Sequence, residues 1–230
     1  TGATSSRQTT AALGFTFIYF GQATTALEIY ADGDNYLVGV GVRFYLQPYF
    51  IRFSGNSYYR QVTAASQLSA LSAQVRAAFP AASAASFSAT NAFVNTRYLD
   101  AYLADPTKLS SFQLVLVTDG AMSFLIFNYE RLDQPSGTAA SSYASASNTP
   151  VTFSPSLTGS NVGTPGRYMF RVDQGIIRYI MKHSLLNIKY RVSCLYVKRR
   201  PPRPLRRRRP RRRAGPAPRR RSPISPSRRV

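Results

Sequence analysis

The chain has 230 residues and a formal net charge of +21, from 30 lysines and arginines against nine acidic residues, and it contains one cysteine and one histidine. One cysteine and one histidine cannot supply the three or four ligands of a zinc site. A Ser-His-Asp triad needs an oriented histidine beside its nucleophile, and the sequence has no G-x-S-x-G elbow. The composition therefore argues against a zinc protein and a histidine-dependent hydrolase, and we expect no enzyme activity and no cofactor.

The positive charge is concentrated at one end of the chain. Twenty of the 30 basic residues lie in residues 178–230, which contain no acid, while residues 1–177 contain the other ten and all nine acids. The basic end is also rich in proline and poor in apolar residues, so it cannot form a packed element. We predict a disordered lead-in (1–12), one domain (13–175) and a basic, Arg/Pro-rich, disordered tail (176–230).

The first part of the domain alternates short apolar segments with turn residues, which is typical of β-strands. Strands are predicted at residues 15–20, 26–30, 36–44 and 57–62, with a turn at Asp32–Gly33.

A helix is predicted for residues 67–79, because apolar residues recur there at spacings of three and four. These residues are Leu68, Leu71, Val75 and Phe79. Thr63 or Ser66 is the expected N-cap, and Pro80 ends the helix.

Asp119-Gly120 predicts a central β-hairpin, because a two-residue type I′ turn needs residues that tolerate positive φ. The predicted pairs are Val117 with Met122, Val115 with Phe124 and Gln113 with Ile126 on one face, and Leu116 with Ser123, Leu114 with Leu125 and Phe112 with Phe127 on the other. Both faces are mostly apolar, so we expect the hairpin to be covered on both sides.

The other predicted elements complete a β-rich domain. They are a strand at 87–98, a loop at Asp105–Pro106, a long low-complexity loop at 133–160 and a last strand at 167–173. The expected fold class is mainly β (α+β), with packed β-sheets around the central hairpin and one covering amphipathic helix.

Three segments of this domain resemble the NIDO (nidogen-like) extracellular domain family. FQLVLVTDG at 112–120 and SFLIFNY at 123–129 are similar to the family pattern NTFQ-x-VL-x-TDG-x-x-SF-x-IFNYG. SNVGTPGRYMFRVD at 160–173 is similar to SN-x-G-x-PGRW-x-FRVD. Residues 55–79 resemble, more weakly, G-x-V-YYR followed by a helix that ends RAAFP.

The resemblance implies a non-enzymatic extracellular domain that serves cell-matrix adhesion or matrix assembly. Its partners would be extracellular matrix or cell-surface proteins, with no small-molecule substrate. The protein would be secreted or the ectodomain of a membrane protein, and the chain a fragment without its signal peptide. The family carries no defined chemistry, so no catalytic, cofactor-binding or metal residue is expected.

The chain has no tryptophan, although the family pattern places tryptophan at several positions. The residues at these positions are Phe50, Asn91, Arg97, Gln134 and Tyr168. Asn91 and Arg97 cannot remove as much apolar surface from water as an aromatic ring does. We therefore expect these two positions to be partly exposed or the domain to be less stable. Glu130 replaces a glycine of the pattern, which predicts an altered turn after the hairpin.

Asp32 and Asp34 form a D-x-D arrangement that could offer oxygen ligands to calcium. The favoured interpretation is a turn in which aspartate bonds to the local backbone. Asp119 is likewise interpreted as a turn residue, and Arg171 with Asp173 as a surface ion pair or a solvated edge.

The arginines of the tail are the candidate site for a different function, the binding of nucleic acid or another polyanion. The candidate residues are Arg206, Arg207, Arg208, Arg209, Arg211, Arg212 and Arg213. The same segment is also compatible with a furin-type processing site, a nuclear localisation patch or an extension read past the end of the domain exon. The last of these is our hypothesis, because the composition changes just after the family pattern ends at Asp173.

Overall fold

The computed structural model describes residues 2–4 (backbone only), 8–49, 56–80, 84–133, 141–144 and 150–174. All of them belong to the first of two compact units, Thr1–Leu186; the second, Asn187–Val230, lies outside the described residues, as do His183, Cys194 and the tail arginines. No helix in the described part of the chain is long and apolar enough to cross a membrane.

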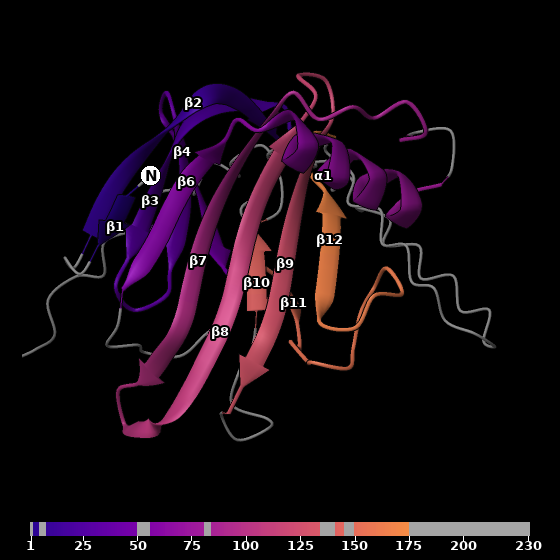
Figure 1. The fold of residues 1–230 in the computed structure, drawn as a ribbon. Helices are drawn as coiled ribbons and strands as arrows, with labels where there is room; N and C mark the ends of the chain where they lie inside the picture. The colour runs from indigo at the N-terminus through magenta and orange to yellow at the C-terminus, as the bar shows by residue number, and fades with distance from the viewer. Residues whose placement is uncertain are drawn as a thin grey trace, which may run out of the picture. The chain divides into compact units, whose positions relative to one another are not determined.

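The described strands form two antiparallel sheets, and one helix covers the outer face of the first (Figure 1). The first sheet has the order β1 (Gly2–Thr4), β6 (Ser57–Val62), β7 (Asn91–Tyr102), β8 (Asp105–Thr118), β9 (Ser123–Leu132) and β12 (Arg167–Arg171). The second has the order β11 (Pro150–Phe153), β10 (Ser141–Ala144), β5 (Val42–Gln47), β4 (Asn35–Gly39), β3 (Gln22–Tyr30) and β2 (Gln8–Tyr19). The helix is α1 (Ala65–Ala78). The predicted fold class is confirmed.

The hairpin β8–β9 contributes to two hydrophobic clusters, one on each face of the first sheet. Leu114, Leu116 and Phe127 face the second sheet and pack with its buried residues. Val115 and Ile126 face α1 on the other side. Neighbouring residues of a strand point to opposite faces, so one hairpin can fill both layers. The expected cover on both sides is confirmed.

The hairpin turn has four residues, not the predicted two. Thr118 pairs with Ser123 and Val117 with Phe124, so every predicted pair is displaced by two residues. A displacement of two keeps each side chain on its predicted face, because side chains alternate with a period of two. Glu130 is the extra residue of a β-bulge inside β9, where the register shifts, and it does not form an altered turn.

The disordered lead-in predicted for residues 1–12 is wrong where the structure describes it. Gly2–Thr4 form β1 and Gln8–Ala12 belong to β2, which pairs with β3. Ala11 and Leu13 are buried in the core at alternate positions. The residues around them are small or polar, which conceals this alternation in the sequence. The proposed limits of the domain, 13–175, are otherwise untested.

Several local predictions also differ from the structure. The single strand at 36–44 is a hairpin, β4–β5, that turns at Gly41 with φ +69°. Asp105–Pro106 begin β8 and are not a loop. The long loop at 133–160 contains β10 and β11.

The helix begins one residue after Ala64, and no side chain caps it. The prediction that Thr63 or Ser66 is the N-cap is therefore wrong.

Candidate interaction face of the first sheet

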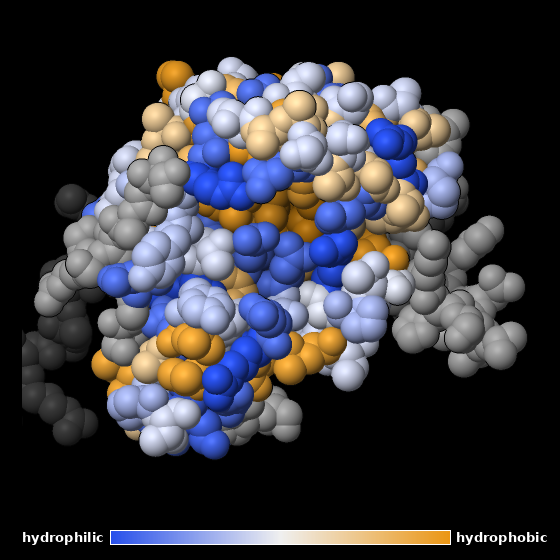
Figure 2. Space-filling model, in the orientation of Figure 1, coloured by the Kyte–Doolittle hydropathy of each residue, from blue (hydrophilic) through white to orange (hydrophobic). Residues whose placement is uncertain are grey.

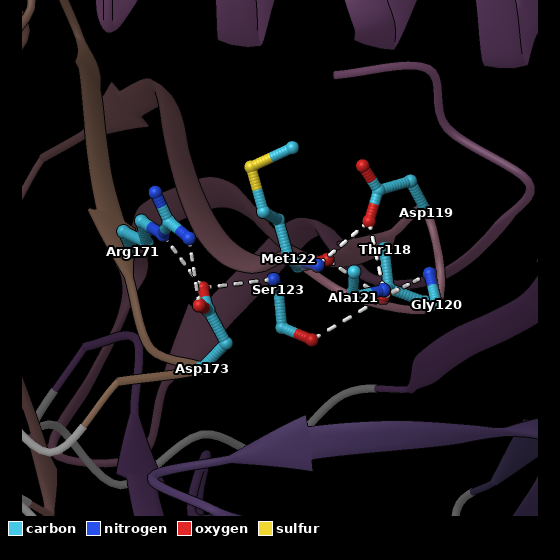
Figure 3. A network of polar contacts seen from close by, with 8 residues as sticks. All are labelled: Thr118, Asp119, Gly120, Ala121, Met122, Ser123, Arg171 and Asp173. Carbon is cyan, nitrogen blue, oxygen red and sulfur yellow. Dashed lines mark hydrogen bonds and ion pairs between the residues drawn. The ribbon is translucent and has the colours of Figure 1, made fainter. Parts of the chain in front are cut away.

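The hairpin tip uses the polar residues of the TDG motif to close its own turn (Figure 3). Oδ1 of Asp119 accepts the backbone N–H groups of Ala121 (2.9 Å) and Met122 (2.6 Å). The Thr118 hydroxyl accepts N–H of Gly120 (3.0 Å) and donates to the Met122 carbonyl (2.7 Å). Gly120 has φ +94°, which favours glycine. Asp119 is a turn residue, as predicted.

The FRVD segment anchors this tip to the neighbouring strand. Asp173 accepts N–H of Ser123 (3.1 Å) and two hydrogen bonds from Arg171, at 2.8 and 2.9 Å. The side chains of Arg171 and Asp173 are only 12% and 6% exposed, so their interpretation as a surface pair or solvated edge is wrong. Residues 118–123 and 171–173 therefore stabilise one another. The TDG and FRVD motifs thus have a structural role in the fold.

Among the described residues, α1 covers one half of the outer face of the first sheet and leaves the other half open. Val94, Val115 and Ile126 lie in the cluster with α1. One or two residues further from the hairpin tip, the outward-facing residues become polar and half-buried. These residues are Thr96 on β7, Gln113 on β8, Asn128 on β9 and Arg167 on β12.

These four side chains form one hydrogen-bonded row, which we call the polar row. They are direct partners across the sheet, Thr96 with Gln113, Gln113 with Asn128 and Asn128 with Arg167. Arg167 Nε donates to Asn128 Oδ1 (2.8 Å), and Asn128 Nδ2 donates to Gln113 Oε1 (3.3 Å). Gln113 Nε2 then donates to Thr96 Oγ1 (2.9 Å). The donors all run in one direction, so each side chain orients the next.

The Pro-Gly-Arg segment explains how Arg167 reaches its place in the row. Gly166 has φ +72°, and a Cβ at this position would lie 2.5 Å from the backbone oxygen of Tyr129. N–H of Tyr129 donates to the Gly166 carbonyl (2.7 Å), and the Ser160 hydroxyl donates to that of Arg167 (2.7 Å). Glycine therefore lets β12 approach β9 closely enough for Arg167 to meet Asn128.

A groove of about 240 Å³ runs between α1 and the polar row. Figure 2 shows this hollow below the helix, with hydrophobic residues at its floor and hydrophilic residues on its rim. The apolar lining is Val62, Val94, Val115, Ala70 and Leu71, and the polar lining is Arg60, Gln67, Gln74, Gln113, Asn128 and Arg167. A second hollow of about 220 Å³ lies on the far side of the row and is bordered by Tyr98 and Glu130.

The groove carries positive charge. Arg60 Nη1 donates to Gln67 Oε1 (3.1 Å). Burial lowers the pKa of the half-buried Arg167 guanidinium from its ordinary value. Within the described residues, the ion pairs are formed by other arginines. Arg60 and Arg167 therefore have no carboxylate partner among the described residues.

Asp32 and Asp34 serve the turn and the second sheet. Asp32 Oδ1 accepts N–H of Asp34 (3.3 Å), which is the local backbone bond expected of a turn. Asp34 Oδ1 accepts the Tyr45 hydroxyl (2.8 Å) and Gln47 Nε2 (3.0 Å). Burial raises the pKa of Asp34, with these two bonds opposing the shift. No group of three or more possible metal-binding residues occurs in the described part of the chain.

The polar row and the groove were not predicted from the sequence. A signal was present, because Gln113, Asn128 and Arg167 are polar residues inside largely apolar motif segments. The candidate arginines at 206–209 and 211–213 lie outside the described residues.

Comparison with known proteins covers two of the three motif segments, 55–79 and 112–129, and ends before the segment at 160–173. The model of the family described as nidogen-like domain matches residues 44–158, half of the chain. Alpha-tectorin of Gallus gallus is 29% identical over 144 residues, and this match covers 52% of the chain but only 7% of alpha-tectorin. No solved structure gives a significant match. On this evidence the chain belongs to the nidogen-like domain family.

Proposed function

We propose that this domain is a non-catalytic module of the extracellular matrix that mediates cell-matrix adhesion by binding matrix or cell-surface proteins. Nidogen-like domains occur in proteins of the extracellular matrix, and alpha-tectorin is similar over half of the chain. The observation that carries the proposal is the open half of the first sheet, where a pre-oriented polar row borders an apolar-floored groove. An apolar centre with a polar rim is the usual anatomy of a protein interface.

The size and lining of the groove favour binding over catalysis. Sites for small molecules usually enclose about 300–1,000 Å³, and this groove of about 240 Å³ is smaller. Its lining has amides, guanidiniums and apolar groups but no carboxylate, imidazole or thiol. Those are the side chains that most often act as general acids, bases or nucleophiles.

The proposal is tested by solid-phase binding of the full chain to a basement-membrane extract at physiological salt. The informative variant replaces the seven tail arginines at 206–209 and 211–213 with glutamine and leaves the domain unchanged. We expect matrix binding to be retained. Loss of all binding in this variant would contradict the proposal and assign the interaction to the tail.

The second candidate function is binding of nucleic acid or another polyanion through the tail. Its supporting observation is the set of twenty basic residues and no acid in residues 178–230. Such binding is strongly salt-dependent, because each neutralised phosphate releases counterions. Heparin and duplex DNA should then bind the unmodified chain, weaken steeply with salt, and lose affinity in the seven-arginine variant.

A further inference from the structure

The groove below α1 has the features of an anion-binding site. Arg60 and Arg167 both line it, and no acidic residue does. Arg60 comes from β6 and Arg167 from β12, so the two cations approach the groove from different strands of the sheet. Both are held by amides, Arg60 by Gln67 and Arg167 by Asn128.

The polar row leaves the distal end of Arg167 available. Its Nε–H is used by Asn128 Oδ1. The two terminal amino groups can then donate to the two oxygens of one carboxylate, the paired geometry for which guanidinium is suited. The half-buried position makes such a pair stronger than on an open surface, because less water screens it.

The floor of the groove indicates which kind of anion fits. Val94 and Val115 form part of the floor, and Leu71 of α1 forms part of the wall. A sulfated or phosphorylated polymer would need a continuous cationic track, whereas here an apolar surface separates two cations. An acidic side chain with an apolar neighbour matches both features. The tail of this chain cannot supply such a side chain, because residues 178–230 contain no acid.

We infer that the groove between α1 and the polar row binds an acidic side chain of a partner protein, with its carboxylate paired by the terminal amino groups of Arg167, its apolar neighbour on the valine floor, and Arg60 adding positive charge from the opposite end of the groove. This inference rests on the proposed function and identifies the chemistry of the partner.

Fluorescence polarisation of the full chain tests the inference with two labelled peptides at physiological salt. One peptide has a single glutamate flanked by leucines, and the other has glutamine in its place. We expect the glutamate peptide to bind more tightly and Arg167→Gln to weaken it about tenfold, the usual scale of one charge-assisted hydrogen bond. Arg60→Gln removes a more distant charge and should weaken it less. Arg43→Gln is the matched control, because it removes the same charge from the second sheet.

A pair of helix variants tests the place of binding separately. Ala70 and Ala73 are both exposed on α1, but only Ala70 lines the groove. Ala70→Glu places a carboxylate at the groove and should abolish binding of the glutamate peptide. Ala73→Glu makes the same chemical change on the same helix and should leave the affinity within about twofold. The tail is present in every variant, so its contribution is constant.

Two results with the peptides alone would overturn the inference. One is equal affinity for the two peptides, and the other is equal loss in Arg43→Gln and Arg167→Gln, which would indicate nonspecific charge. Stronger dependence on Arg167 for a heparin hexasaccharide than for the glutamate peptide would assign the site to a sulfated glycan instead. If the full chain binds matrix extract but not the glutamate peptide, the inference fails and the proposed function stands. If the peptide binds but the extract does not, the proposed function fails.

Discussion

Arg97 and Asp100 form an ion pair inside the domain, with 2.6 Å between Nη1 and Oδ2 and side chains only 3% and 0% exposed. Arg97 Nη2 also donates to the Tyr30 carbonyl (2.5 Å), which connects the first sheet to β3 of the second. Leu99, between the pair, has φ +48°, and the register of β7 and β8 shifts here. The expectation that position 97 is partly exposed is therefore wrong. Arginine stays buried where the family pattern has tryptophan because an acid three residues later neutralises it.

Removing one member of this ion pair should lower the free energy of unfolding more than removing both members. Arg97→Leu leaves the buried Asp100 carboxylate without its guanidinium, and we expect the free energy of unfolding to fall by about 3–5 kcal/mol. Arg97→Leu combined with Asp100→Leu removes both charges and should be more stable than the single variant. Urea denaturation of the two proteins measures the difference. A double variant that is less stable than Arg97→Leu would contradict this account.

The parts of the fold that were predictable from sequence are those set by periodicity. The two-sided apolar pattern of the hairpin placed it at the centre, because each face had to be buried. The register was not predictable, because the Asp119 side chain closes a four-residue turn where Asp-Gly alone suggests two. Strand β10 was missed because its sequence SSYA gives little hydrophobic contrast, and β11 because PVTF is only four residues long and begins with proline.

The candidate site depended on pairing between distant segments. Asn128 and Arg167 are 39 residues apart, and only the register of β9 with β12 makes them neighbours. A resemblance could indicate the motif segments but not which motif residues meet. Some motif residues, such as Asp119 and Asp173, stabilise the turn, and others are half-buried on the open face of the sheet.

Gly166→Ala should destabilise the domain more than Gly120→Ala. Both glycines have positive φ, so alanine is strained at either position. A Cβ at 166 would also meet the Tyr129 backbone at 2.5 Å, whereas at 120 nothing lies within 4 Å. We expect a loss of about 1–2 kcal/mol at Gly120 and a larger loss at Gly166, measured by thermal and urea unfolding. Equal losses would show that β12 can shift to relieve the contact.

The Tyr129 hydroxyl connects the two sheets across the core. It donates to the Pro48 carbonyl (2.6 Å), just after β5, and the ring lies in the cluster between the sheets. Tyr129→Phe keeps the ring and removes one of two donors to that carbonyl, because the Ser141 hydroxyl also donates to it, so it should cost about 0.5–1.5 kcal/mol of unfolding free energy. Tyr58→Phe is the control, because Tyr58 is 48% exposed, and it should change stability by no more than about 0.5 kcal/mol. A loss at Tyr129 no larger than at Tyr58 would contradict a connecting role.

Alkaline pH should unfold the domain through its buried tyrosines. Burial raises the pKa of Tyr19 and Tyr129 well above the ordinary value of 10.0, and that of Tyr49 to about 12. A raised pKa means that the folded state keeps the proton while the unfolded chain loses it. The stabilisation is therefore complete below about pH 10 and is lost as pH rises through the folded values. Urea midpoints should decline above about pH 10, and less steeply in Tyr129→Phe; a decline of equal slope in both proteins would rule out Tyr129 as a contributor.

Asn161 protects the outer edge of the first sheet, where β12 has no further strand beside it in the described structure. Its Oδ1 accepts N–H of Met169 (2.9 Å) and its Nδ2 donates to the carbonyl of the same residue (2.8 Å). The side chain thus pairs with β12 as a neighbouring strand would, and unpaired edges are templates for aggregation. Asn161→Ala should lower the unfolding free energy by about 1–3 kcal/mol, since it leaves two buried backbone groups without partners, and should accelerate aggregation measured by light scattering. Asn161→Asp keeps the acceptor for the Met169 N–H but places a buried carboxylate oxygen against the Met169 carbonyl, so its loss should be at least as large. If Asn161→Ala unfolds earlier without aggregating faster, the amide stabilises β12 but does not protect the edge.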